Sequence, residues 1–381
     1  MKIGFAGRWH PNDKTKWSGI YYSTWKELCK HHTVEVFYYT WPFYVREYLL
    51  LHKLFQKLIG KKAAVEFLTS YAKYFSKQLE KDLCKRKVDL LFCPGAPQLL
   101  AYCTTSIPVV YMADASFQQL QGYYDNFSGM ANYNIIQGIN LDKKAFSRAA
   151  HCMLASGWAR ASAIQDYGIN SNKISVIPFG ANTENISSEG NVEKKKNGVC
   201  KLLFLGVEWE RKGGAIALDT IRILNNTDFP VQLTIIGCAP RGFKQGEWSM
   251  PGVTVIPFIN RNNIAAAAQL REIMLQTDFL LLPARAECAG IVFCEAAAFG
   301  IPSITTDTGG IGTYVEHNST GFTLPLTATA KAYAKLIMDM YKDDLRYRQI
   351  SKNSRNKFEQ ELNWEVWGKQ FNTIAEMIIE H

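Results

Sequence analysis

The chain has 381 residues, of which 47% are hydrophobic and 20% charged, and its formal net charge is +9. This composition describes an ordinary globular protein. One hydrophobic core rarely grows beyond about 250 to 300 residues, so we expect two domains. No apolar run reaches the roughly 18 residues that a transmembrane helix needs, and the first residues are typical of a strand rather than a signal peptide. The sequence therefore predicts a cytoplasmic protein.

The positive charge is concentrated in one segment. Between Arg46 and Lys87 there are eleven Lys or Arg against four Asp or Glu, while the rest of the chain is close to neutral. Apolar and aromatic residues recur there at helical spacing, which predicts two amphipathic helices broken near Gly60. They are either surface helices with solvated lysines or a face for an anionic membrane surface at residues 46–87. Nucleic acid is not predicted, because no nucleic-acid-reading motif accompanies the charge.

The cysteines do not form a disulfide or metal pattern. There are nine cysteines and seven histidines, scattered without a CxxC pair. This distribution is typical of reduced core cysteines in a reducing compartment. We therefore expect no protein-held metal and no cofactor, and only Cys288 lies in a candidate site.

Apolar runs alternate with helical segments through the first 180 residues. Strands are predicted at residues 2–6, 33–39, 88–93, 107–112, 151–155 and 174–180. Ser18 and Gly19 stand in the loop after the first strand, before a predicted helix at 20–30, and such a loop is a usual ligand position. It is not a GxGxxG fingerprint, so a nicotinamide or flavin site is poorly supported. Asp114 comes directly after the fourth strand.

The alternation begins again after a polar stretch at 186–198. Strands are predicted at 201–206, 231–236, 253–257, 279–282 and 301–305. The predicted fold class is therefore α/β, with two Rossmann-like parallel-sheet domains that face each other across a cleft. The expected domains are an acceptor-binding domain at 1–185, a linker at 186–198 and a nucleotide-binding domain at 199–360. A helix in 361–381 is expected to pack back on the first domain.

Two cations follow the first strand of the second half. Arg211 and Lys212 stand next to two glycines in the sequence GVEWERKGG, and this combination suits an anion such as a diphosphate. The alternative is a solvated loop. Gly237 and Pro257 end the next two strands, where they either hold a nucleotide base or form plain turns.

The segment 283–300, PARAECAGIVFCEAAAFG, carries the strongest signal. A strand, a short turn and a helix beginning at Gly290 present backbone N–H groups and a positive dipole end to an anion. Glu287 lies in the turn, and Glu295 lies eight residues later in an otherwise apolar helix. A carboxylate is costly to bury without a partner, so we expect Glu295 to face a polar group.

These motifs resemble glycosyltransferase family 4, whose fold is GT-B. The resemblance is carried by FLGVEWERKG at 204–213, LPARAECAGIVFCEA at 282–296, GIPSIT at 300–305 and DTGG at 307–310. It extends more weakly to SGW at 156–158 and VIPFGAN at 176–182. About two thirds of the chain takes part. A pair of glutamates eight residues apart is weak alone, but it is quite specific in this context.

The resemblance implies a role for each matching residue. Glu287 would contact hydroxyls of a donor sugar, Glu295 would hold the ribose, and Lys212 would bind the diphosphate. The residues that the resemblance and the loop positions place around the donor are Gly206, Arg211, Lys212, Gly237, Pro257, Gly290, Ile291, Val292 and Glu295.

The chain departs from the family pattern at three places. Val207 stands where the family commonly has an arginine, and Arg211 would then substitute for it. Asp114 stands where many members have a catalytic histidine; it would accept the acceptor's proton, bind the donor sugar or merely cap a helix. Ser18-Gly19 stands in place of an early glycine pair.

The resulting hypothesis is a retaining, metal-independent glycosyltransferase with Glu287, Asp114 and Lys212 in catalysis. It would move a hexosyl group from a UDP- or GDP-sugar to a glycan or lipid-linked acceptor, in cell-surface polysaccharide or glycolipid synthesis at the inner face of the membrane. The alternatives are an NDP-sugar epimerase of the same fold and a non-catalytic sugar-nucleotide-binding partner.

Overall fold

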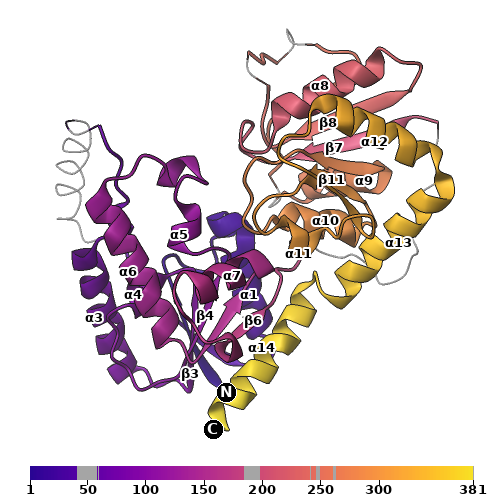
Figure 1. Cartoon of the computed structure of the whole chain (residues 1–381). Coiled ribbons are helices and arrows are strands. Elements are labelled where there is room, and N and C mark those ends of the chain that lie inside the picture. The colour runs from indigo at the N-terminus through magenta and orange to yellow at the C-terminus, as the bar shows by residue number, and fades with distance from the viewer. Residues whose placement is uncertain are drawn as a thin grey trace. The chain divides into compact units, whose positions relative to one another are not determined.

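The computed structural model describes residues 1–40, 58, 60–183, 198–240, 242–245, 249–260 and 263–380. The chain forms two compact units (Figure 1). Unit 1 comprises Met1–Pro178 and Trp364–His381, and unit 2 comprises Phe179–Asn363. The first predicted amphipathic helix falls largely, and the predicted linker almost entirely, outside the described residues.

A parallel sheet with the strand order β2-β1-β3-β4-β5-β6 forms the centre of unit 1. Its strands are β1 (Lys2–Gly7), β2 (Thr33–Tyr38), β3 (Leu90–Pro94), β4 (Val109–Ala113), β5 (His151–Leu154) and β6 (Ile174–Val176). All six agree with predicted strands to within a few residues. The central strands are buried on both faces, which explains their continuous apolar sequence.

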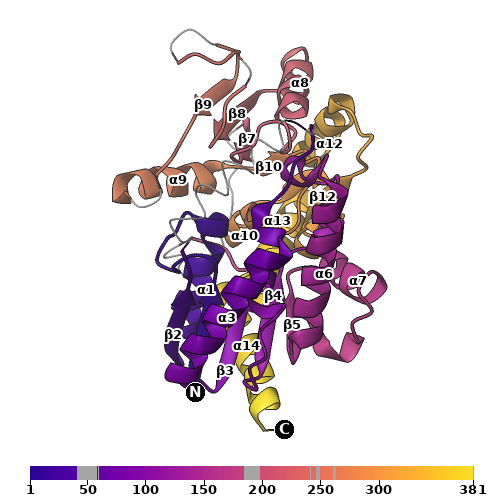
Figure 2. The ribbon, with the colours of Figure 1, turned by 90° about the vertical axis from the view of Figure 1, so that its left-hand side faces the viewer.

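Helices cover both faces of this sheet. They are α1 (Ile20–Leu28), α3 (Thr69–Lys85), α4 (Pro97–Leu100), α5 (Phe117–Leu120), α6 (Asn132–Arg148), α7 (Gly157–Gln165) and α14 (Trp364–Ile379), with 3₁₀ turns η1 (Lys16–Gly19), η2 (Val65–Phe67), η3 (Asp125–Phe127) and η4 (Ser171–Lys173). Helices α3, α4 and α6 lie on one face and α1 and α14 on the other (Figures 1 and 2).

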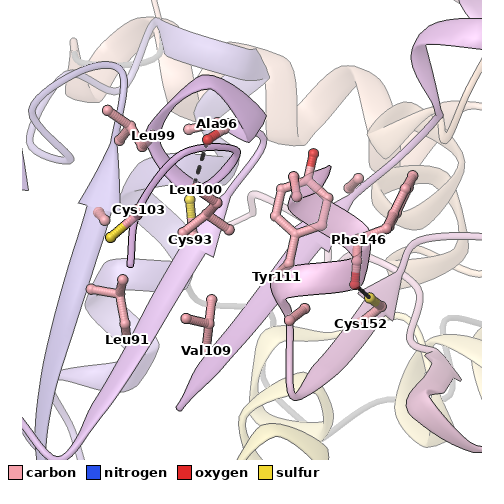
Figure 3. Packing of buried hydrophobic residues seen from close by; sticks show 14 of the residues in the cluster. Leu91, Cys93, Ala96, Leu99, Leu100, Cys103, Val109, Tyr111, Phe146 and Cys152 are labelled. Carbon is pink, nitrogen blue, oxygen red and sulfur yellow. Dashed lines mark hydrogen bonds between the residues drawn. The ribbon is translucent and has the colours of Figure 1, made fainter. Parts of the chain in front are cut away.

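Side chains of β3 alternate between these two layers. Leu91 and Cys93 point into the core beneath α3 and α4, where Leu99 and Leu100 also pack (Figure 3). Phe92 points the other way.

Most of the nine cysteines are buried and all are free, although Cys29 and Cys84 are exposed rather than in the core.

The final helix completes the second layer of unit 1. The Trp367 and Phe371 rings of α14 lie 5.7 and 5.3 Å from the ring of Phe92. Gly368 allows α14 to lie close to α1, because an added Cβ there would lie 2.7 Å from Cγ of Glu27 in α1. The C-terminal helix therefore packs on the N-terminal unit.

Unit 2 repeats the plan with the strand order β12-β11-β10-β7-β8-β9. Its strands are β7 (Cys200–Leu205), β8 (Val231–Ile236), β9 (Val253–Ile256), β10 (Phe279–Leu282), β11 (Ser303–Thr306) and β12 (Gly321–Leu324), and its helices are α8 (Gly214–Asn225), α9 (Ile264–Gln276), α10 (Ile291–Ala298), α11 (Ile311–Tyr314), α12 (Ala330–Lys342) and α13 (Asp344–Gln360). Helix α8 packs with α12, and α10 packs with α13. The edge strand β12 was not predicted.

The boundary between the units lies earlier than the predicted end of the first domain at residue 185. Phe179 donates its backbone N–H to the Tyr314 hydroxyl at 3.2 Å and accepts from the Cys294 thiol at 3.2 Å. Ala181 donates its N–H to the carbonyl of Leu362 at 3.0 Å. Because these partners all belong to unit 2, the chain joins that unit at Phe179.

Helix α3 is amphipathic, as the segment 46–87 predicts. Its apolar side, including Phe75 and Leu79, is buried against the sheet, whereas Lys73, Lys77 and Lys81 are exposed. Among the described residues no helix is long and apolar enough to cross a membrane. Helix α3 therefore presents lysines, not its apolar side, to the surroundings.

Candidate functional site

Two loops of unit 2 meet where the strand order of its sheet reverses. After β7 the chain turns to β8 on one side, and it later returns to β10 on the other side. Crevices at the carboxyl ends of the strands at such reversal points are the usual ligand positions of open α/β sheets. The loop after β7 and the loop after β10 touch, because Arg285 donates its backbone N–H to the carbonyl of Arg211 at 2.7 Å.

A glycine allows this close approach. Gly213 precedes α8 with φ of 76°, and an added Cβ would lie 1.9 Å from the carbonyl oxygen of Pro283. Any other side chain at this position would clash with the backbone of the second loop. Gly213 thus fixes where Lys212 lies.

Lys212, Arg211 and Glu287 converge between these loops. Lys212 Nζ donates to Glu287 Oε2, and Arg211 Nη1 donates to the same oxygen at 3.2 Å and to the carbonyl of Ala286 at 2.8 Å. Lys212 is only 7% exposed and Glu287 only 6%. The alternative of a solvated loop is therefore wrong for Lys212.

The carboxylate of Glu287 is held in its charged form. Burial alone would raise its pKa, but the charges of Lys212 and Arg211 and their hydrogen bonds bring the pKa below its ordinary value. Arg211 also pairs with Glu208, whose side chain is half exposed, so water screens that pair. Two cations share one buried carboxylate, and this arrangement suits a further anion.

The start of α10 lies next to this cluster. Gly290 precedes the helix with φ of 71°, and an added Cβ there would lie 3.1 Å from Cγ of Glu287. Ile291 and Val292 begin the helix, so their N–H groups have no helical carbonyl upstream. Lys212 and the backbone donors around Gly290 therefore flank the same carboxylate.

Three further residues that the sequence analysis predicts around the donor lie along the same edge of the sheet. Gly206 donates its N–H to the carbonyl of Ile236 at 3.0 Å, and Gly237 donates to that of Ile256 at 3.1 Å. An added Cβ on Gly206 would lie 3.1 Å from Cγ of Lys212, whereas one on Gly237 would lie 2.8 Å from the Gly206 carbonyl. Pro257 is exposed directly beyond β9.

The remaining predicted residues of unit 2 differ in exposure. Glu295 is buried in the second turn of α10, and Cys288 is buried beside Glu287. Val207 is 73% exposed, so no cation comes from that position. Arg211 supplies the second positive charge at Glu287.

The loops of unit 1 meet at the corresponding reversal between β1 and β3. Trp17 packs on Gly95, and its indole N–H donates to Asp114 Oδ2 at 3.1 Å. The alternative that Asp114 caps a helix is wrong, because Ser116 caps α5 by accepting the N–H of Gln119. Asp114 therefore lies at the end of β4 beside the loop that carries Ser18.

The backbone of that loop is strained. Trp17 and Ser18 have φ of 48° and 53°, and Gly19 follows with φ of 84°. Left-handed conformations of non-glycine residues cost about 1 to 3 kcal/mol each and are often found at functional sites. Sequence reasoning selected Ser18 and Gly19 but missed Trp17, whose only signal was a tryptophan directly before the small residues.

A buried carboxylate supports the segment after Asp114. Asp142 of α6 accepts the N–H of Phe117 at 2.5 Å and also hydrogen-bonds the hydroxyl of Tyr167. Burial raises its pKa to about 7, despite these two hydrogen bonds. The titratable groups that face it are the hydroxyls of Tyr111 and Tyr167. Within the described part of the chain no cation pairs with Asp142.

We expect Asp142→Asn to change how stability depends on pH. A raised pKa means that the native state holds the proton more tightly than the unfolded state, so this group lowers stability as pH rises from about 4 to about 7. Asparagine removes that fall and keeps an acceptor for Phe117. In denaturant titrations the free energy of unfolding of the variant should exceed that of the wild type by up to about 4 kcal/mol at pH 8 and by little at pH 4. Asp125→Asn, an exposed control, should show no such divergence; parallel curves for Asp142→Asn would contradict the assignment.

Comparison with known protein families places the unit 2 site in context. Residues 187–357 match the family described as glycosyl transferases group 1. This range contains both loops that carry Lys212 and Glu287. The match is confined to unit 2.

Curated relatives match parts of the chain. The N-acetyl-alpha-D-glucosaminyl L-malate synthase of Bacillus anthracis is 29% identical over 103 residues, which is 27% of this chain and 27% of the relative. The amylovoran biosynthesis glycosyltransferase AmsK of Erwinia amylovora is 22% identical over 217 residues, which is 55% of this chain and 52% of the relative. The chain thus spans between about a quarter and a half of these relatives.

Solved structures match the whole chain. The sucrose-phosphate synthase of Thermosynechococcus elongatus superposes with a TM-score of 0.71 at 14% identity, over 100% of this chain and 99% of that one. Together with the two six-stranded parallel sheets, this likeness establishes the GT-B fold, with two Rossmann-like units.

Proposed function

We propose that this protein is a retaining glycosyltransferase that takes a hexosyl group from a UDP- or GDP-sugar. The observation that carries the proposal is the meeting of Lys212, Arg211 and Glu287 beside the start of α10, at the strand reversal of unit 2. The group 1 family match covers this site. The name of AmsK, a glycosyltransferase, supports sugar transfer as the reaction class.

The donor's diphosphate would displace the cations from Glu287. Lys212 and Arg211 would then contact the phosphate oxygens, together with the N–H groups of Ile291 and Val292. Glu287, released from its ion pairs, would accept hydrogen bonds from hydroxyls of the donor sugar. Glu295 would hold the ribose, and the backbone of Gly237 and Pro257 would flank the base.

Sugar transfer breaks the bond between the anomeric carbon and the diphosphate oxygen. The bonding electrons go to the leaving nucleoside diphosphate, so negative charge grows where the fixed cations and helix N–H groups lie. The acceptor oxygen forms the new bond on the same face of the sugar, which retains the configuration. Its proton goes to the leaving phosphate; Asp114 is the alternative proton acceptor in this proposal.

Metal independence is part of the proposal. The charge that a divalent cation would neutralise on a diphosphate is instead met by Lys212 and Arg211. Transfer should therefore continue in excess EDTA.

The acceptor class is proposed as a glycan or lipid-linked saccharide of cell-surface polysaccharide synthesis. Support comes from AmsK, a protein of amylovoran biosynthesis. Contact of the exposed lysines of α3 with an anionic membrane surface is a further part of this proposal.

Incubation of the protein with labelled UDP- and GDP-hexoses, in EDTA and with a glycan or lipid extract, tests the proposal. We expect label from one donor to enter the extract, with the anomeric configuration of the donor kept in the product. Isomerised donor without acceptor would indicate an epimerase, and nucleotide-sugar binding without either product would indicate a non-catalytic partner. Either outcome would overturn the transferase proposal.

A further inference from the structure

Unit 1 contains a cavity whose lining does not include Asp114. It is a cavity of about 250 Å³ at the carboxyl ends of β1 and β2, walled by α3 and α4. The lining residues that matter here are Trp9, His10, Tyr38, Tyr71 and Gln98. A molecule of liquid water takes about 30 Å³, so the cavity has room for about eight waters, on the scale of one sugar ring.

Aromatic rings form most of its wall. The rings of His10 and Tyr38 lie 4.9 Å apart at 87°, and those of Tyr71 and Phe75 lie 4.4 Å apart. Trp9 is held edge-on to Tyr21 at 5.4 Å. The rings are thus fixed by one another and offer rigid surfaces against which the C–H face of a pyranose can pack.

The charged residues of the cavity are already balanced. Arg8 pairs with Glu66 at 3.4 Å and lies over the ring of Trp9 at 4.6 Å. Asp13 pairs with Lys16 at 3.6 Å. Each of these charges already has a partner of opposite sign, so the pairs add no net charge that would attract an anion. The charges therefore favour a neutral occupant.

Gln98 contributes a polar side chain to the lining of the cavity. It is 3% exposed, yet its side-chain amide has no hydrogen-bond partner among the described residues and faces the cavity instead. Because the amide opens onto the cavity, a ligand or water in the cavity would supply its hydrogen-bond partners. A side-chain amide offers a donor and an acceptor side by side, which matches two neighbouring hydroxyls of a sugar.

His10 adds a donor of defined direction. Its Nδ1 accepts the backbone N–H of Asn12 at 3.2 Å, so the neutral ring carries its proton on Nε2. In this tautomer His10 donates to a ligand oxygen from Nε2. Its part is to orient a hydroxyl, not to remove a proton.

From the balanced charges, the aromatic wall and the unpaired amide, we infer that this cavity binds a neutral sugar ring at the end of the acceptor, with Gln98 recognising two neighbouring hydroxyls. The inference rests on the proposed transferase function, which it extends by naming the acceptor chemistry and the residues that select it. An acceptor that ends in a phosphate or in an acyl chain does not fit these groups.

Ligand-observed NMR tests the inference on the full chain without donor, so that failure here is separate from failure at unit 2. The probes are methyl glycosides of glucose, galactose, mannose and N-acetylglucosamine, with glycerol 3-phosphate as the anionic arm. We expect at least one neutral glycoside to bind at millimolar concentration and its Kd to rise at least fivefold in Gln98→Met, which keeps shape but loses the amide. Gln165→Met, an exposed control on α7, should bind like wild type.

In transfer assays, Gln98→Met should raise the KM of the acceptor about tenfold and leave the KM of the donor unchanged. The inference is overturned if no neutral glycoside binds, if binding is unaffected by Gln98→Met, or if glycerol 3-phosphate binds in place of the glycosides. Unchanged UDP or GDP binding in calorimetry would show, in each of these cases, that the proposed donor site of unit 2 still stands.

Discussion

Glu287→Gln should bind UDP or GDP more tightly than the wild-type protein while transferring sugar far more slowly. In the structure Lys212 and Arg211 both donate hydrogen bonds to Oε2 of Glu287. In our proposal these are the two cations that bind the diphosphate, so the carboxylate competes with it. A neutral amide competes less well, and a charge-assisted hydrogen bond is worth about 1.5 to 3 kcal/mol, so affinity should rise about tenfold. Loss of the carboxylate that we propose binds hydroxyls of the donor sugar should lower turnover at least about 100-fold.

Titration calorimetry and transfer rates measured on the same preparations check this pair of effects. Glu316→Gln is a matched control, because Glu316 also pairs with a buried lysine of unit 2, Lys357, at 2.6 Å. That variant should leave both nucleotide affinity and turnover unchanged. Weaker nucleotide binding in Glu287→Gln, or wild-type turnover, would contradict the competition between carboxylate and diphosphate.

Lys212→Ala should lower turnover by about 100- to 1,000-fold, the usual cost of removing one preorganised group that stabilises developing negative charge. Lys212 is buried against Glu287. A cation from the solvent therefore cannot replace its ammonium group in the variant. The KM of the donor should also rise, because we propose that the same ammonium binds the diphosphate of the bound donor. The fold should persist, since Arg211 still pairs with Glu287.

Steady-state kinetics with the preferred nucleotide-sugar measure both effects. Lys201→Ala serves as the control: it lies in β7, the strand that leads to Lys212, but its ammonium bonds Gln276 at 2.8 Å on the surface. Turnover in Lys212→Ala within a factor of a few of this control would show that the leaving diphosphate is not stabilised there.

The repeating pattern of apolar runs was enough to predict the fold, because strands buried on both faces read as continuous apolar segments. The edge strand β12 was missed because it is only four residues long, GFTL, and contains no continuous apolar run. The boundary at Phe179 was missed because it depends on contacts with Tyr314 and Leu362, far away in sequence. Local sequence contains no signal for such pairs.

The candidate site could also be predicted in part, from the positions of its residues after predicted strands. Lys212 and Glu287 each follow a strand, and the reversal of strand order brings their loops together. That both cations donate to one carboxylate oxygen could not be predicted, since it depends on Gly213 packing against Pro283. Trp17 and Gln98 were missed because a tryptophan and a glutamine in a loop or helix start resemble ordinary packing residues until their neighbours are known.

Thermal unfolding across a panel of UDP- and GDP-sugars in EDTA tests the central claim most directly, because a ligand that binds only the native state raises stability by about 2.7 kcal/mol at 100 times its Kd. We predict that one nucleotide-sugar raises the melting temperature of the wild-type protein and that Lys212→Ala largely abolishes the rise. If no nucleotide-sugar stabilises the protein, or if Lys212→Ala responds as strongly as wild type, then the loops around Lys212 and Glu287 are not a donor site.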